Sequence, residues 1–216
     1  MVDIIIAAAI TLGVTVGVAW LVSLWDKTGY TESVPQELTV PMSETDLLMI
    51  AKTQEIITEV FGDDVCKTIA DMKNTERINI MAVFAERLIE EYGLDVDVDI
   101  FVAEAEYCGT YLIDNNKAMF NINILMLDKD HELYEKCVRT VLCEIIHELR
   151  HAMQWKAIND KDFLETDEAT REIWKNNFYN YIDLEVDSRG YSEQPVEKDA
   201  YTFASLVMEG VRHYEK

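Results

Sequence analysis

Basic residues are scarce in this chain. Lysine and arginine together number 19 against 41 aspartate and glutamate residues, and the formal net charge is -22 at pH 7. A surface with this charge repels the phosphates of nucleic acids and anionic lipid headgroups. We therefore exclude nucleic acid as a partner and interpret the acidity as a well-hydrated surface, which would also steer cationic peptides toward the protein.

Cysteine and proline are also rare, with four and three residues. No two cysteines have the CxxC spacing of a metal site or a redox pair, and we expect reduced thiols, which favour a reducing compartment such as the cytoplasm. Two of the three prolines fall within residues 26–43, a stretch without apolar periodicity that is predicted to be a linker. The remaining residues, 44–216, are long enough for one domain with its own core.

Charge is absent over the 22 positions of residues 4–25. A helix of that length reaches roughly 33 Å, which is enough to cross a bilayer. Its acidic start and bulky end favour an uncleaved anchor over a signal peptide or a buried core helix. We therefore predict a transmembrane helix over residues 1–25 and a single-pass membrane protein, with no charge asymmetry to assign its side. Gly13 and Gly17 form a GxxxG spacing that would allow two such helices to pair as a homodimer.

The chain after residue 43 predicts an α+β domain that is mainly helical, with a small sheet packed on one long helix. Ser43 and Asp46 have the spacing of a capping box, which marks the start of the first helix. Helical spacing predicts helices over residues 44–61, 64–73, 75–92 and 132–155, and one more from residue 195. Alternation and turn residues predict strands over residues 94–102, 108–113 and 118–124, the last two joined as a hairpin.

The sequence His147-Glu148-Leu149-Arg150-His151 lies on the predicted helix over residues 132–155. Histidines one helical turn apart project their imidazoles from one face, so both can bind a single metal ion. Neutral imidazole nitrogens suit Zn²⁺, and a zinc site with three protein ligands leaves a position for water. Glu148 lies beside the two rings and is predicted to act as the general base for that water.

A third zinc ligand must come from elsewhere in the chain, and the candidates downstream of the motif are mainly carboxylates. Glu197 is the preferred candidate, because Pro195 can begin a helix whose first turn presents that side chain. Glu193, Asp183 and Glu185 stay open as alternatives.

At these two motifs the chain resembles the minimal gluzincins, particularly the bacterial and phage metallopeptidases related to the ImmA/IrrE group. In that group HExxH on one helix is followed by a pattern like ExxAxxFA, which here is formed by Glu197, Ala200, Phe203 and Ala204. The resemblance spans roughly residues 94–210. It implies a zincin-like domain with zinc endopeptidase activity, in which His147, His151 and Glu197 hold Zn²⁺ and Glu148 is the base.

The resemblance also implies an edge strand near residues 118–124 that would hold an extended substrate by backbone pairing. Two features depart from the group. Tyr201 stands where asparagine is frequent, and no helix-turn-helix module is present, so the resemblance does not extend to cleavage of a repressor.

Several other residues near the motifs invite assignment. We expect Arg150 to be a surface ion-pair member, and Tyr181, which continues the helical spacing of Trp174 and Phe178, to be a core residue. Asp199 would either orient a ligand histidine or lie in solvent. Candidate donors to the oxyanion, with packing or surface roles as the alternative, are Tyr191, Tyr201 and His213.

Two functions follow from these patterns. The first is a membrane-anchored zinc endopeptidase that cleaves a protein or peptide substrate. The second is a membrane-tethered binding module without catalytic activity, in which the metal is structural. Glu148 separates the two, because a structural site closes its fourth position with a protein ligand and has no use for a carboxylate beside bound water.

Overall fold

The computed structural model describes residues 3–4, 41–103, 109–123 and 127–214. It is an α+β fold, mostly helical with a small sheet, as the sequence predicts. The helices are α2 (Glu44–Phe61), α3 (Val65–Ala70), α4 (Asn74–Glu91), α5 (Tyr134–Asn159), α6 (Glu168–Tyr179), α7 (Ser188–Glu193) and α8 (Pro195–Tyr214). The strands are β1 (Asp3–Ile4), β2 (Asp97–Ala103), β3 (Gly109–Leu112) and β4 (Lys117–Asn123).

The start and the end of α2 follow the predicted signals. The Ser43 side chain accepts a hydrogen bond from the Asp46 backbone N–H, and the Asp46 carboxylate accepts one from the Ser43 backbone N–H, so the predicted capping box is confirmed. At the other end Gly62 has φ of 75°, a conformation that glycine adopts without a steric penalty. These local signals set the position of Asp46, which matters below.

The sheet has the strand order β1-β2-β4-β3. The hairpin between β3 and β4 is confirmed, with antiparallel pairing, whereas β2 and β4 run parallel. The predicted edge strand over residues 118–124 is wrong, because β4 bonds β2 on one side and β3 on the other. Because β4 pairs with β2 as well as with β3, it lies inside the sheet, and β3 is the outer strand of the sheet among the described residues.

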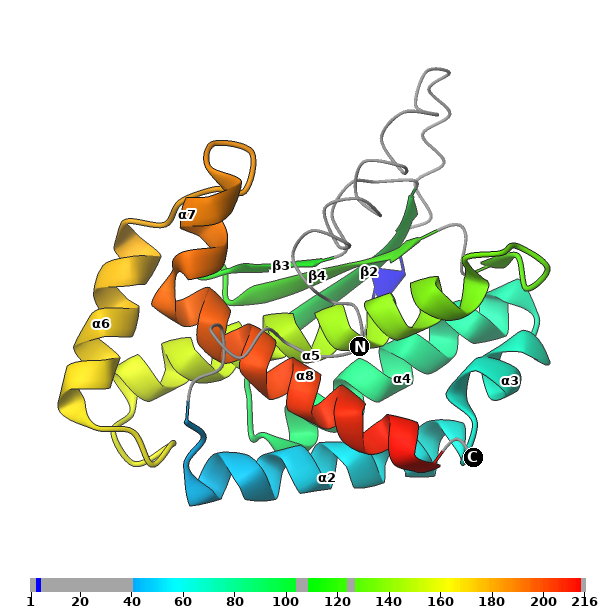
Figure 1. Ribbon diagram of the computed structural model, residues 1–216, viewed down its shortest axis with the longest axis horizontal. Coiled ribbons are helices and arrows are strands. Elements are labelled where there is room, and N and C mark those ends of the chain that lie inside the picture. The colour runs from blue at the N-terminus through cyan, green and yellow to red at the C-terminus, as the bar shows by residue number, and fades with distance from the viewer. Residues whose placement is uncertain (1–2, 5–40, 104–108, 124–126, 215–216) are drawn as a thin grey trace.

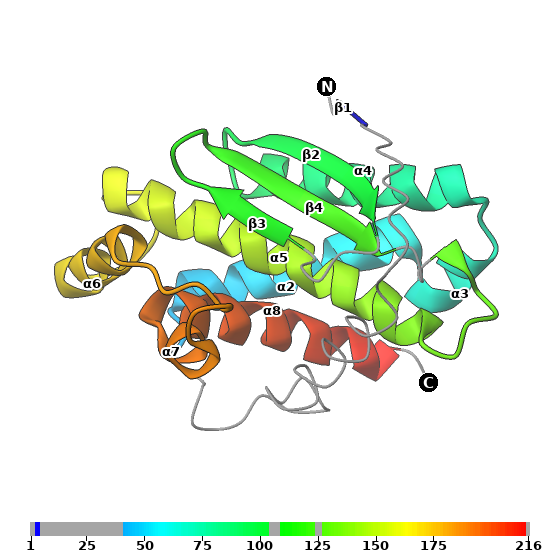
Figure 2. The same cartoon turned by 90° about the horizontal axis from the view of Figure 1, so that it is seen from above.

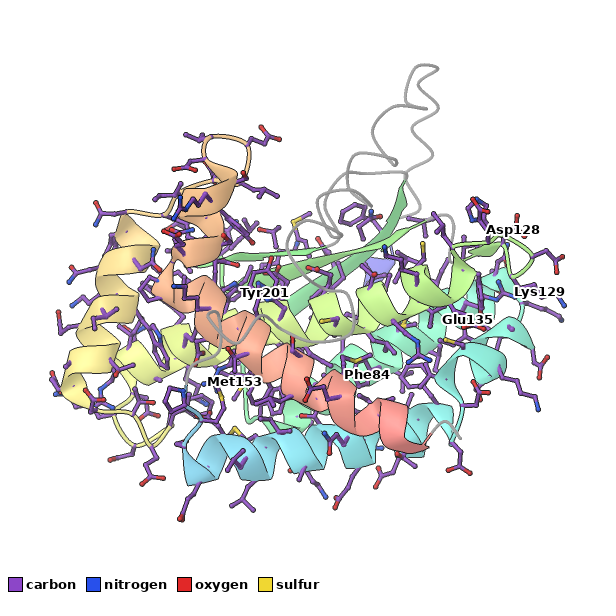
Figure 3. All side chains as sticks on the ribbon, in the orientation of Figure 1. Phe84, Asp128, Lys129, Glu135, Met153 and Tyr201 are labelled. Carbon is purple, nitrogen blue, oxygen red and sulfur yellow. The ribbon has the colours of Figure 1, made fainter. Side chains whose placement is uncertain are left out.

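The long helix α5 runs through the middle of the domain. The sheet lies on one side of it, with β3 and β4 in contact with α5, and α2 and α8 lie on the other side (Figures 1 and 2). Phe84 on α4 and Met153 on α5 are fully buried in the core between these layers (Figure 3). Because α5 is covered from several directions, its residues from Ile145 to Gln154 are all buried. The helix that carries the HExxH motif is therefore a central core element.

The prediction of a single-pass membrane location is corrected by the fold. Within the described ranges, no helix is both long and apolar enough to cross a bilayer. Asp3 and Ile4, at the start of the predicted transmembrane helix, instead form the strand β1, which pairs parallel with β2. Residues 5–40, which contain most of the predicted anchor and linker together with the Gly13 and Gly17 pair, lie outside the described residues.

Candidate metal centre

Two histidines and one glutamate meet in the interior, between α5 and the first turn of α8. The Nε2 atoms of His147 and His151 lie 3.0 Å apart. Glu197 Oε2 lies 3.2 Å from His147 Nε2, and Glu197 Oε1 lies 3.1 Å from His151 Nε2. The three residues are nearly inaccessible to solvent, with exposures of 2%, 5% and 0%. We call them the donor cluster.

The position of Glu197 is set by the start of α8. Pro195 is the first residue of the helix, where its missing N–H costs no hydrogen bond. The next backbone N–H, that of Val196, donates to Asn177 Oδ1 on α6 at 3.1 Å. Glu197 therefore points inward from a helix terminus that α6 holds in place, and the N-terminal end of a helix favours a negative charge.

The spacing of the donor atoms fits a zinc ion. Donors around tetrahedral zinc lie about 2.0–2.2 Å from the metal and so about 3.3 Å from one another. The three separations of 3.0, 3.1 and 3.2 Å are close to that value. Glu197 Oε2 is buried, and no described residue forms a hydrogen bond with it. Buried polar atoms without partners are rare, and a metal ion would satisfy this one.

Without metal, the donor cluster holds its charges as an ion pair. Burial alone would lower the pKa of His151, but the Glu197 carboxylate raises it to about 9. Burial alone would raise the pKa of Glu197, but His151 and His147 lower it well below its ordinary value. The carboxylate is thus charged and available as a ligand, and a metal cation would replace the proton that His151 otherwise carries.

Glu148 lies between the donor cluster and β3. Its side chain passes so close to the strand that a Cβ built on Gly109 would lie 2.7 Å from Glu148 Cγ, which only glycine permits. The Tyr111 backbone on β3 forms a hydrogen bond with the carboxylate. Burial raises the pKa of Glu148, partly offset by His147 and His151. The hairpin thus positions a buried carboxylate with a raised pKa beside the rings of His147 and His151, an arrangement suited to proton transfer near neutral pH.

Three tyrosines surround Glu197. The Tyr181 hydroxyl donates to Glu197 Oε1 at 2.5 Å, although its ring is partly exposed. Tyr191 on α7 hydrogen-bonds with Tyr181 and Tyr201. The Tyr201 ring, which projects from α8 (Figure 3), lies 4.4 Å from the His147 ring. Burial and the nearby carboxylate raise the pKa of each phenol, so all three remain hydrogen-bond donors. The prediction that Tyr181 is a core residue is therefore wrong.

Arg150 is buried, which corrects the expectation of a surface ion pair. Only 1% of the residue is exposed. It donates to Asp199 through Nε at 2.7 Å and through Nη2 at 3.1 Å, and its Nη1 lies 2.6 Å from Asp46 Oδ1. The Phe203 ring covers the guanidinium at 4.8 Å. We call Arg150, Asp46 and Asp199 the arginine cluster; it joins α2, α5 and α8, and it shows that Asp199 is not in solvent.

The alternative third ligands lie away from the donor cluster. Asp183 and Glu185 are exposed in the segment between α6 and α7. Glu193 is half exposed and pairs with Arg189 at 2.8 Å. Of the four carboxylates considered, only Glu197 meets the two histidines, in the one group with metal-ligand spacing among the described residues. The side chain of His213, a candidate oxyanion donor, lies outside the described part of the chain.

Sequence patterns missed Gln154 and Gly109, and assigned the wrong role to Tyr181. Gln154 lies three residues after His151 on the same helix, a spacing that allows contact and could have marked it. Gly109 and Tyr181 reach the cluster only through the hairpin and through the end of α6, and no local signal in the sequence reports such contacts.

Comparisons with known proteins add no assignment to this geometry: no family model, no curated protein and no solved structure matches the chain.

Proposed function

We propose that this protein is a zinc-dependent endopeptidase of the gluzincin type with a zincin-like fold, in which His147, His151 and Glu197 bind Zn²⁺. The observation that carries the proposal is the buried carboxylate of Glu148 next to three converging metal donors, one of which has an oxygen without a hydrogen bond. A structural zinc site would have no use for that carboxylate. The alternative of a binding module without catalytic activity leaves Glu148 unexplained.

The reaction would be hydrolysis of a peptide bond. Zinc, when bound, supplies a Lewis acid that lowers the pKa of bound water toward about 7. Glu148 accepts the proton of the attacking water on a carboxylate oxygen as the new C–O bond forms. It then passes that proton to the nitrogen of the leaving amine as the C–N bond breaks. The raised pKa of Glu148 suits a group that must both take and release a proton near neutral pH.

The surrounding residues would bind the substrate. β3 is the outer strand of the described sheet and lies against Glu148, so an extended peptide pairing with it would lie close to the donor cluster. Because the Tyr181 hydroxyl already donates to Glu197 Oε1, Tyr191 and Tyr201 are the tyrosines that would donate to a carbonyl oxygen that gains negative charge. The net charge of -22 favours approach of cationic peptides.

The test is the substitution Glu148→Gln in the full chain. We expect one zinc per chain in both proteins, and cleavage of an unfolded protein substrate slowed by about 10²–10⁴-fold in the variant, since only the proton acceptor is lost. The matched control is Glu135→Gln, an exposed glutamate in the first turn of the same helix (Figure 3), which should leave cleavage unchanged. Equal cleavage by wild type and Glu148→Gln would remove the peptidase proposal.

A further inference from the structure

Gln154 connects the donor cluster to the arginine cluster. It is fully buried on α5, one turn after His151. Its Oε1 lies 2.9 Å from His151 Nδ1. Its Nε2 donates to the Val196 backbone carbonyl at 2.9 Å and to Asp199 Oδ2 at 2.7 Å. Every polar atom of this amide therefore has a partner inside the protein.

The partners of Gln154 fix which end of the amide faces His151. A backbone carbonyl and a carboxylate can only accept hydrogen bonds, so the atom between Val196 O and Asp199 Oδ2 must be the NH₂ group. Rotating the amide by 180° would place its oxygen against these two acceptors. The carbonyl oxygen of Gln154 is therefore the atom that faces the imidazole.

The orientation of the amide in turn fixes the proton of His151. Gln154 Oε1 can only accept, so the bond of 2.9 Å requires the proton to be on His151 Nδ1. In the neutral ring, Nε2 then keeps its lone pair, and this is the nitrogen that lies 3.1 Å from Glu197 Oε1 and 3.0 Å from His147 Nε2. Because Nδ1 keeps its proton in either charge state of the ring, Nε2 is the nitrogen that a metal would bind once its own proton is displaced.

The arginine cluster holds this arrangement from behind. Asp199 Oδ2 accepts from both Gln154 Nε2 and Arg150 Nε, each at 2.7 Å. Arg150 holds the Asp199 carboxylate in place through Nε and Nη2, and its Nη1 donates to Asp46 Oδ1. A charged, anchored Asp199 is a strong acceptor, which makes rotation of the Gln154 amide costly.

The second histidine has no such support. His147 Nδ1 is buried and has no hydrogen-bond partner among the described residues, and its ring packs against Tyr201 instead. The Nδ1 sides of the two rings are thus held differently, that of His151 by a chain of hydrogen bonds and that of His147 without a hydrogen bond from the described residues.

We propose that Gln154 is a positioning residue that locks His151 in the Nδ1–H tautomer and so presents Nε2 to the metal, with Asp199 and Arg150 setting the orientation of its amide. The proposal rests on the zinc site of the proposed function. It assigns to a glutamine the role of the outer partner that most metal-bound histidines require.

The first experiment measures zinc affinity by competition with a chelator, independently of any cleavage. Gln154→Met keeps the length of the side chain and removes both amide atoms, and we expect zinc to bind about 10–100-fold more weakly. The matched control is Gln54→Met, because Gln54 on α2 also donates two hydrogen bonds across helices, to Leu206 O and Val207 O, without contact to a donor residue. The control should bind zinc as the wild type does.

A conservative variant separates positioning from mere stability. Gln154→Glu keeps an oxygen that accepts from His151 Nδ1, but it places a carboxylate beside Asp199 and loses the bond to Val196 O. We expect a lower unfolding temperature with zinc affinity close to that of the wild type. If affinity falls in Gln154→Glu as far as in Gln154→Met, the role of Gln154 is only structural and the proposal is overturned.

A third experiment uses only the zinc-loaded wild type, so its outcome does not depend on whether a variant folds. Proton NMR should show the His151 Nδ1 proton downfield of the His147 Nδ1 proton, because only the His151 proton is hydrogen-bonded to an amide oxygen, that of Gln154. Coincident resonances would overturn the proposal. A wild type that binds no zinc would overturn the proposed function as well, whereas a wild type that binds zinc, with Gln154→Met equally tight, would overturn this inference alone.

Discussion

The donor cluster and the arginine cluster are two buried polar groups on the same helix, and they differ in how well they are satisfied. Around Arg150, each hydrogen bond pairs a guanidinium nitrogen with a carboxylate oxygen at 2.6–3.1 Å. Around His147 and Glu197, one nitrogen and one oxygen are buried without a hydrogen bond from any residue that the structure describes. Both clusters carry charge into the core, yet only one is complete from the chain's own residues.

This difference indicates a structural role for one cluster and a binding role for the other. A buried polar atom without a hydrogen bond destabilises a fold, so a chain tolerates it where another ligand completes the site. The arginine cluster needs no such ligand. It joins three helices and, through Gln154, reaches the back of one histidine, so the complete cluster supports the incomplete one.

The largest effect is expected from breaking the arginine cluster. Arg150→Met leaves Asp199 and Asp46 buried without a cation, and we expect the free energy of unfolding to fall by about 3–5 kcal/mol. Urea denaturation of the metal-free chain measures it. Arg87→Met is the control, because Arg87 pairs with Glu59 at an exposed position and should cost less than about 1 kcal/mol. Similar losses for the two variants would refute the structural role of the arginine cluster.

A smaller effect is expected from the donor cluster, and only when metal is present. Zinc at about 100 times its Kd should stabilise the wild type by about 2.7 kcal/mol, and a chelator should remove this gain. Glu197→Gln should abolish the response, since it removes a ligand charge, while Glu193→Gln should keep it because Glu193 pairs with Arg189 at the surface. Thermal unfolding of each variant with and without zinc measures the response. Stabilisation of Glu197→Gln by zinc as large as that of the wild type would exclude Glu197 as a ligand.

The pH dependence of stability tests Asp46. Burial would raise the pKa of this carboxyl, but Arg150 and Ser43 lower it below the ordinary 3.8. A group with a lowered folded pKa stabilises the fold above its unfolded pKa, and this contribution is lost as the pH falls through the folded value. Asp46→Asn should therefore cost roughly 2 kcal/mol near neutral pH and progressively less below about pH 4. Denaturation of both proteins between pH 2 and 7 measures this. A difference in unfolding free energy between wild type and Asp46→Asn that stays constant over this range would contradict the assignment.

The smallest effect is expected at Gly109, where the sheet touches Glu148. Gly109→Ala adds a methyl group 2.7 Å from Glu148 Cγ, so the carboxylate must shift. We expect kcat/KM for peptide cleavage to fall about tenfold, which corresponds to about 1.4 kcal/mol, with zinc affinity unchanged. Steady-state kinetics measures kcat/KM, and chelator competition on the same preparation measures zinc affinity. An unchanged kcat/KM would show that β3 does not position Glu148.

Local patterns predicted most of the fold. The capping box at Ser43, the hairpin between β3 and β4 and the helix that begins at Pro195 all depend on neighbours in sequence, and each lies within a few residues of its prediction. The strand order was not predictable from alternation, which reports only which face of a strand is buried. The edge strand near residues 118–124 was implied by the family resemblance, and the strand order of this chain places β4 inside the sheet instead.

The candidate site was predictable where two donor residues share a helix and unpredictable where contacts cross the fold. His147 and His151 follow from the helical period, and Glu197 followed from the helix start at Pro195. Arg150 was misplaced because helical periodicity assumes one face in solvent, whereas α5 is buried around its whole circumference from Ile145 to Gln154. A central helix leaves no outer face for a charged residue, and such a residue must find partners inside.

Asp46 uses its two carboxylate oxygens for different tasks. Oδ2 closes the capping box at Ser43, and Oδ1 lies 2.6 Å from Arg150 Nη1. A recombinant fragment trimmed to begin after residue 46 would therefore lose a helix start and the counterion of a core arginine in a single cut. Domain boundaries for expression should be placed upstream of Ser43, even though the metal donors begin more than one hundred residues later in the sequence.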